Sequence, residues 1–233
     1  MSGLSKRGGF VPLLALALLG GLAACSSAPP VPDWQLNARD ATRRGTAAYL
    51  EGRSRVADAE FARARREASR SARADAVARV ELARCAAQTA SLDPTPCDAV
   101  APLQADMGLP QQAYRRYLAG RPVAGDADAL PEPQRAVARG LLAPESGADP
   151  AARLPEGDAL SRLVAAAVLV QAGQGSPAVV AAAVQAASDQ GWTRPLLAWL
   201  GWQLRQAQAA GDAELARRTQ ARLDLLAAPE KIK

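Results

Sequence analysis

The 233-residue chain carries 28 lysines and arginines against 23 acidic residues, for a net charge of +5, and it contains no histidine. The missing histidine excludes Ser-His-Asp and Cys-His catalysis as well as every histidine-ligated metal site. Alanine, leucine and arginine are abundant and aromatic residues make up only 4% of the chain, a composition typical of an all-α protein.

The first 24 residues have the organisation of an export signal. Lys6 and Arg7 form a short basic region, and the segment 10–19 after them is apolar, with Pro12 as its one breaker. This run is shorter than the roughly 20 apolar residues that cross a bilayer. Residues 1–24 are therefore predicted to be a cleaved signal peptide; an uncleaved anchor and an ordinary secretory signal are the alternatives.

A short motif ends this signal, in the order Leu22-Ala23-Ala24-Cys25. It resembles the lipobox of bacterial lipoproteins, in which lipoprotein signal peptidase cleaves before a cysteine that carries a diacylglyceryl group. The resemblance implies that Cys25 becomes the acylated first residue of the mature protein and its attachment to the membrane. The next residue is Ser26 and not aspartate, which by resemblance to enterobacterial sorting implies the outer membrane, facing the periplasm.

A proline-rich segment, residues 25–32, is predicted to be a lipidated tether. Its seven residues after the cysteine extend at most about 25 Å. The residues that follow are basic, since twelve arginines stand against eight acids between positions 26 and 84. This excess indicates either a solvated helix face or a surface for anionic lipid or an acidic partner, and nucleic acid is not expected as a partner of an exported protein.

Small residues recur at helical spacing through the predicted N-terminal helical region, residues 33–119. Residues 38–71 resemble one tetratricopeptide repeat, in which small residues let two antiparallel helices approach and a glycine makes the turn. The matching positions are Gly45, Gly52, Ala57, Phe61 and Ala64, and the departures are Ala41, Arg44, Ala48 and Ser69. We therefore expect an all-α protein of antiparallel helical hairpins, either a tetratricopeptide-like solenoid or an irregular bundle.

Two cysteines remain once Cys25 is set aside. Cys85 and Cys97 form an even pair, and an exported protein meets an oxidising compartment, so the spacing predicts a structural disulfide. Closing this ring stabilises the fold by about 3 kcal/mol in the chain-entropy model. A redox-active dithiol is the alternative, although such pairs usually have a Cys-x-x-Cys spacing.

The middle of the chain contains a tyrosine pair and then a change of composition. Tyr114 and Tyr117 lie three residues apart on a predicted helix, and we expect them to pack with their hydroxyls at the surface. Residues 120–157 are rich in proline, glycine and acids, which predicts a connecting region with one short helix. Its acids Asp126, Asp128 and Glu132 lack the spacing of a calcium loop and indicate a solvated loop.

Helical hairpins are predicted again over residues 158–228, before a tail at 229–233. The Ser176-Pro177 pair is a helix-start signal within this region. Three tryptophans follow closely, and they indicate either ordinary core or an aromatic groove for a partner helix or peptide. They are Trp192, Trp199 and Trp202.

The favoured hypothesis is a lipid-anchored, periplasm-facing scaffold or assembly factor that binds a protein partner and performs no catalysis. It resembles repeat-containing envelope lipoproteins such as pilotins and activators of cell-wall synthases. Two alternatives remain: an enzyme that cleaves envelope glycans with paired carboxylates, and a carrier of a lipid or small apolar ligand that uses the tryptophan region. Neither a cofactor nor a metal is expected.

Overall fold

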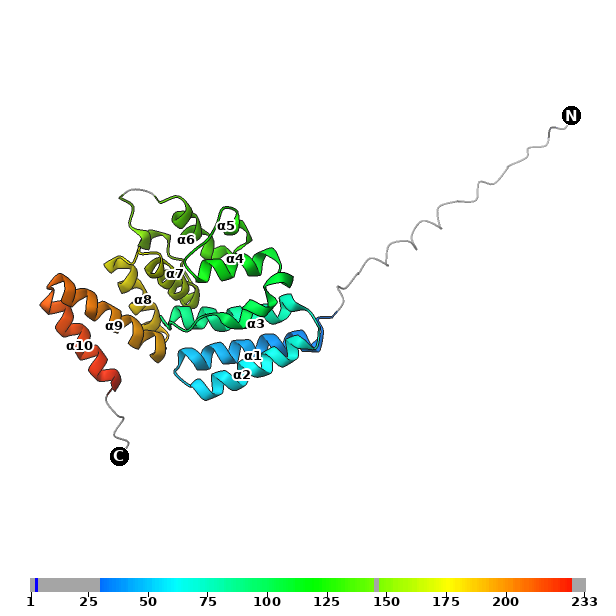
Figure 1. The fold of residues 1–233 in the computed structure, drawn as a ribbon, viewed down its shortest axis with the longest axis horizontal. Coiled ribbons are helices and arrows are strands. Elements are labelled where there is room, and N and C mark those ends of the chain that lie inside the picture. Colours follow the sequence, from blue (N-terminus) through cyan, green and yellow to red (C-terminus); the bar gives the residue numbers. More distant parts are fainter. Residues whose placement is uncertain (1–2, 4–29, 145–146, 228–233) are drawn as a thin grey trace. The chain divides into compact units, whose positions relative to one another are not determined.

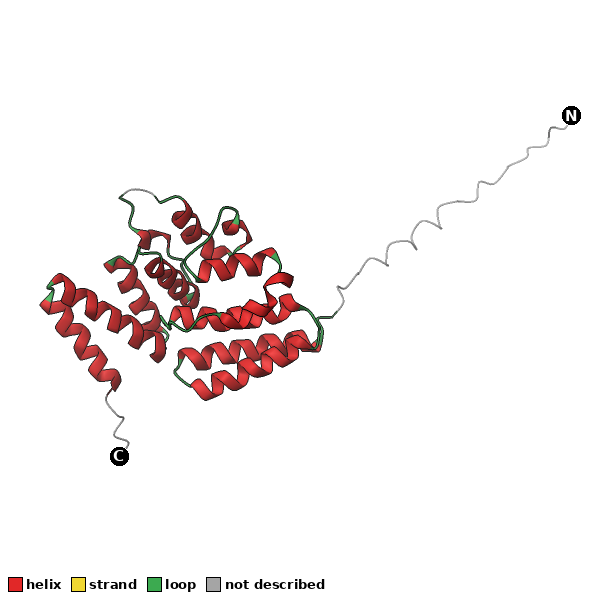
Figure 2. Ribbon diagram, in the orientation of Figure 1, coloured by secondary structure: helices red, strands yellow, loops and turns green. Residues whose placement is uncertain are grey.

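The computed structural model describes residues 3, 30–144 and 147–227 and is helical throughout these ranges, with no strand in them (Figures 1 and 2). The all-α prediction is confirmed. Residues 32–233 form one compact unit. The predicted acylation site Cys25, Ser26, the predicted tail and all of the predicted signal peptide except Gly3 lie outside the described residues. No described helix combines the length and apolar character needed to cross a membrane.

The first two helices form an antiparallel hairpin, α1 (Asp33–Leu50) and α2 (Ser54–Ser69). Gly52 makes the turn with a φ of 84°, which a residue with a side chain rarely adopts. A Cβ atom on Gly45 would lie 3.1 Å from the ring of Phe61, so the two helices approach as closely as they do because that position has no side chain. The predicted stripe on α2 is confirmed, since its members Ala57, Phe61, Ala64 and Ala68 are all buried.

The third helix, α3 (Ala74–Ala90), lies centrally, packed against α1, α2, α4 and α7 (Figure 1). It is joined to the following segment by the predicted disulfide between Cys85 and Cys97, whose Cα atoms lie 5.6 Å apart. The disulfide therefore fixes the chain where it leaves the central helix.

The predicted connecting region, 120–157, contains more helix than its composition indicates. Two elements precede it, η1 (Asp98–Asp106) and α4 (Leu109–Leu118), and three lie within it: α5 (Asp126–Ala129), α6 (Glu132–Leu142) and η2 (Pro150–Arg153). The expectation of a solvated loop at Asp126 is wrong, because this side chain is buried and accepts hydrogen bonds from Arg116 and from the amide of Val123. This one ion pair anchors α5 to α4.

The C-terminal part is a series of helices in which each packs on the next: α7 (Ala159–Gln171), α8 (Pro177–Asp189), α9 (Thr193–Ala210) and α10 (Ala213–Ala227). The helix-start signal at Ser176 is confirmed, since its hydroxyl accepts a hydrogen bond from the amide of Val179. The helix α7 is buried on nearly all sides, from Leu163 to Leu169. It joins the C-terminal helices to α3.

A candidate binding groove

Two adjoining hollows share the side chain of Arg79 and together form what we call the α1–α3 groove. The larger has a volume of about 570 Å³ and the smaller about 240 Å³. The larger is lined by Thr46, Arg79, Leu82, Ala83, Ala86, Pro110, Gln111, Tyr114, Ala129, Leu130, Pro131 and Leu160. The smaller is lined by Trp34, Gln35, Ala38, Arg39, Thr42, Ala68, Ala76, Arg79 and Val80.

One side of α1 supplies the first wall of the α1–α3 groove. Gln35, Arg39, Thr42 and Thr46 follow at spacings of four, three and four residues, which places them along one helix face. Arg44, two residues from Thr46, points to the other side and pairs with Glu60 of α2 at 2.9 Å. Since two residues are about 200° apart around a helix, the larger hollow lies on the side of α1 opposite Arg44, whereas the smaller hollow also borders Ala68 of α2.

The floor and the second wall are mostly hydrocarbon. Leu82, Ala83 and Ala86 come from α3, and Leu160 comes from the first turn of α7. Pro131 lies between α5 and α6, and Tyr114 comes from α4, so five separate stretches of chain meet around the larger hollow. These apolar residues lie far apart in the sequence, and they form one apolar surface only after folding.

The charge of the groove is positive. Arg39 and Arg79 both line it, and none of the lining residues, all within the described ranges, is acidic. Arg79 lies 3.2 Å from Asp75 on the preceding turn, whereas Arg39 makes no ion pair with a described residue. The hydroxyl of Thr42 is already used, donating to the carbonyl of Ala38. The groove thus offers apolar contact beside guanidinium groups, and its lining contains no nucleophile beside a base.

The two tyrosines singled out by the sequence divide between the groove and the core. Tyr114 lines the larger hollow, and burial together with the nearby charge of Asp158 raises its pKa. Tyr117 is fully buried, and its hydroxyl donates to the side-chain oxygen of Gln134 at 2.6 Å. The expectation that both hydroxyls lie at the surface is therefore wrong for Tyr117. The rings are nearly parallel, with centroids 6.3 Å apart.

The three tryptophans do not form a shared surface on α9. Trp199 is fully buried and its indole nitrogen donates to the carbonyl of Ala90 at 2.9 Å, which joins α9 to the end of α3. Trp192 and Trp202 are half-buried and pack against the core. The indole N–H of Trp202 has no hydrogen-bond partner among the described residues, and Arg205 lies over its ring. The structure therefore places Trp199 in the core and Trp192 and Trp202 at its edge.

A second hollow, of about 720 Å³, lies where α9 meets the α1–α2 turn. The guanidinium of Arg194 stacks 4.3 Å above the ring of Tyr49 and donates to its carbonyl oxygen and to the hydroxyl of Ser54. The hydroxyl of Tyr49 donates to Asp93. Because these polar groups satisfy one another, the hollow is best described as a joint between distant segments. No pattern in the sequence indicates this contact, because its residues lie far apart along the chain.

Ionisation at this joint follows from these contacts. Burial first, and then the hydrogen bond to Asp93, raise the pKa of Tyr49. Burial acts to raise the pKa of Asp93, but hydrogen bonds from Thr95 and Tyr49 outweigh it and lower that pKa. The joint therefore contains a neutral tyrosine and a charged carboxylate at neutral pH.

No group of three or more cysteine, aspartate or glutamate side chains among the described residues is placed to hold a metal ion. No protein-family model matches the chain, and neither a curated protein nor a solved structure matches it.

Proposed function

We propose that the protein is a lipoprotein acylated at Cys25, attached to the outer membrane and facing the periplasm, which binds a protein partner in the α1–α3 groove without catalysing a reaction. The observation that carries this proposal is the groove itself: an apolar surface, open to solvent, with Arg39 and Arg79 along it and no acidic lining residue. The proposed partner segment is a helix with apolar side chains on one face and carboxylates beside them.

The dimensions of the groove suit such a helix. Trp34 and Thr46 are twelve residues apart on α1, which corresponds to about 18 Å, and a partner helix of about 12 residues has the same length. Apolar anchors one helical turn apart would contact Ala83, Pro131 and Leu160, which line the larger hollow and are not fully buried. Carboxylates on the same helix would meet guanidinium groups, and such charge-assisted hydrogen bonds are stronger than neutral ones.

The apolar lining also gives a specific reason to keep a second candidate, a carrier of a lipid or small apolar ligand. Its volume lies within the roughly 300–1,000 Å³ typical of small-ligand sites. The carrier would use the α1–α3 groove and not the tryptophan region, where Trp199 fills the core. The glycan hydrolase gains no support from the groove, because paired carboxylates are absent from its lining.

Two synthetic helical peptides test the proposal against the compact unit 32–233. They share leucines at one-turn spacing and differ only in having glutamates or lysines beside them. We expect the acidic peptide to bind at least about tenfold more tightly in fluorescence anisotropy. Equal affinities would contradict the role of the arginines, and binding of a fatty acid in place of both peptides would establish the carrier.

A matched pair of variants locates the binding surface. Ala83→Trp places a large ring in the α1–α3 groove, whereas Ala59→Trp places the same ring on an exposed position of α2. Only the first substitution should abolish peptide binding, and equal effects of the two would exclude the groove as the site. The anchor is tested separately, since Cys25→Ala should remove acyl labelling and release the protein from membranes.

A further inference from the structure

The outward face of α2 is a basic surface, which we call the α2 arginine face. Its four arginines fall within roughly 80° of one another at 100° per residue, opposite the buried stripe of the same helix. All four are exposed, and they extend over about 22 Å. They are Arg55, Arg63, Arg66 and Arg70, with the exposed Ala59 and Ala62 between them.

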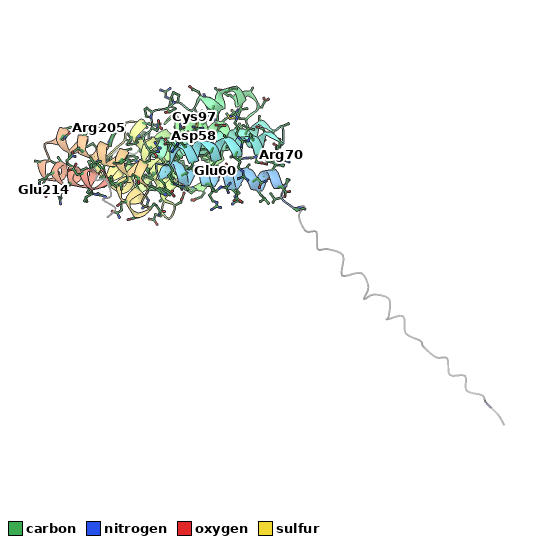
Figure 3. The ribbon with its side chains drawn as sticks, turned by 90° about the horizontal axis from the view of Figure 1, so that it is seen from below. Asp58, Glu60, Arg70, Cys97, Arg205 and Glu214 are labelled. Atoms are coloured by element: carbon green, nitrogen blue, oxygen red, sulfur yellow. A yellow bond between two sulfur atoms is a disulfide. The ribbon has the colours of Figure 1, made fainter. Side chains whose placement is uncertain are left out.

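Two of the three carboxylates of α2 turn away from this face. Asp58 pairs with Arg84 of α3 at 2.7 Å and Glu60 pairs with Arg44 of α1 at 2.9 Å. Figure 3 shows Asp58 and Glu60 on α2, with Arg70 at its end. Because neighbouring helices engage Asp58 and Glu60, and only Glu67 pairs with an arginine of the face, the α2 arginine face retains an excess of positive charge.

The cations on the face have few partners of their own. Arg55 and Arg66 make no ion pair with any described residue, and Arg63 interacts with Glu60 only at long range. Arg70 lies 3.1 Å from Glu67, yet its side chain remains 66% exposed. Three of the four guanidinium groups therefore make no ion pair with a described residue, and this exposed row of positive charge complements a negatively charged surface.

We infer that the α2 arginine face binds the anionic phospholipid surface of a bilayer. The chain outside the compact unit ends at Val31, two residues before α1 begins at Asp33, and Arg70 lies at the end of the hairpin where α1 begins (Figure 3). A membrane attachment at Cys25 would therefore deliver this end of the hairpin to the lipid surface. An acyl chain and a basic surface are the pair of signals that together give stable membrane binding.

This arrangement is compatible with partner binding. Arg44 pairs with α2 whereas Thr46 lines the α1–α3 groove, so the groove and the α2 arginine face point in different directions from the hairpin. Contact of α2 with lipid leaves the groove open to the aqueous compartment. The inference extends the proposed function but does not depend on the groove.

The test is co-sedimentation of the compact unit 32–233 with phospholipid vesicles. Vesicles of phosphatidylcholine alone are compared with vesicles containing roughly 30% phosphatidylglycerol, and we expect binding only to the second, weakening as salt is added. Since each arginine near an anionic surface strengthens binding roughly fivefold, the fourfold arginine-to-glutamine variant of the α2 arginine face should bind at least about tenfold more weakly. The substitutions are Arg55→Gln, Arg63→Gln, Arg66→Gln and Arg70→Gln.

Two further variants separate this surface from net charge and from folding. The matched control removes four exposed arginines elsewhere, Arg121, Arg205, Arg217 and Arg218, and should keep its affinity within about twofold. Replacing the four arginines of α2 by lysine keeps the charge and should keep binding. Circular dichroism checks that each variant remains folded.

Several results would overturn the inference. One is the absence of binding to the anionic vesicles, and another is an equal loss in the α2 variant and the matched control. Binding to polyglutamate but not to vesicles would instead assign the face to an acidic protein. The protein used here has no Cys25, so failure to bind vesicles contradicts this inference alone, whereas failure of acylation contradicts only the proposed anchor.

Discussion

The α1–α2 hairpin and the α7–α9 region are both well packed, but with side chains of different size. The hairpin buries alanines, and Gly45 lies directly against Phe61. The α7–α9 region also buries alanines, but with them it buries several leucines and valines and the large ring of Trp199. In the first region the helices lie close together with no room for added atoms, whereas in the second the large side chains fill the space between the helices. The hairpin should therefore be sensitive to added atoms and the C-terminal region to lost ones.

The largest effect is expected for Trp199→Ala. This change leaves a cavity in the core and removes the hydrogen bond to the carbonyl of Ala90. The free energy of unfolding should fall by about 3–5 kcal/mol, measured by urea denaturation. Trp202→Ala is the control, because that side chain is half-buried and its indole N–H has no described partner. An equal loss in both variants would contradict the assignment of Trp199 as the main core residue of α9.

Removal of the disulfide comes next. The double substitution Cys85→Ala and Cys97→Ala opens a ring with a sequence separation of 12 and should cost about 3 kcal/mol. Reductant should lower the urea midpoint of the native protein and leave that of the double variant unchanged. Without reductant, a thiol reagent should label neither cysteine of the compact unit, and labelling of both would show that the bridge is absent in solution.

The contact between Arg116 and Asp126 is expected to be sensitive to acid. The hydrogen bond from Arg116 lowers the pKa of Asp126, against the opposing effect of burial. A depressed pKa in the folded state means that the stabilisation is complete above about pH 4, the value for an unfolded aspartate, and is lost as the pH falls through the folded value. Asp126→Asn should cost about 2 kcal/mol at pH 7 and should flatten the loss of stability below about pH 4. An unchanged pH dependence would contradict this role.

The smallest effect is expected for a glycine-to-alanine substitution made in each region. The two substitutions should change the free energy of unfolding in opposite directions. Gly45→Ala adds a Cβ atom 3.1 Å from Phe61 and should cost about 1 kcal/mol. Gly201→Ala in α9 adds a Cβ atom whose nearest neighbour is the end of Arg205 at 3.7 Å, and it should stabilise the protein by about 0.5–1 kcal/mol. Phe61→Leu should relieve part of the first cost in a double-mutant cycle. Two changes of the same sign would contradict the comparison.

Local patterns in the sequence predicted local structure well. The stripe through Ala57, Phe61 and Ala64 and the turn at Gly52 predicted the first hairpin, because both depend on residues a few positions apart. The helix α5 was missed because its four residues stand among prolines and glycines. Its ion pair joins Arg116 to Asp126, and composition carries no information about such a pair.

The groove could be predicted only in part. Tyr114 was singled out by its neighbour Tyr117, and it does line the α1–α3 groove. Arg39 and Arg79 were missed because each has the spacing of an ordinary solvated helix residue. They come to the same groove only when α1 and α3 pack side by side. That packing depends on contacts between helices, which the spacing within either helix does not describe.

The contact of Arg194 with the α1–α2 turn has a consequence for the order in which the protein matures. Its two hydrogen bonds join residues 145 and 140 positions apart. A chain that emerges from its N-terminus can form the first hairpin early, because that hairpin is local. It cannot complete the joint at Tyr49 until most of the chain, through Arg194, has emerged. A product truncated before Arg194 would therefore lack both of these hydrogen bonds at the α1–α2 turn, in addition to its missing helices.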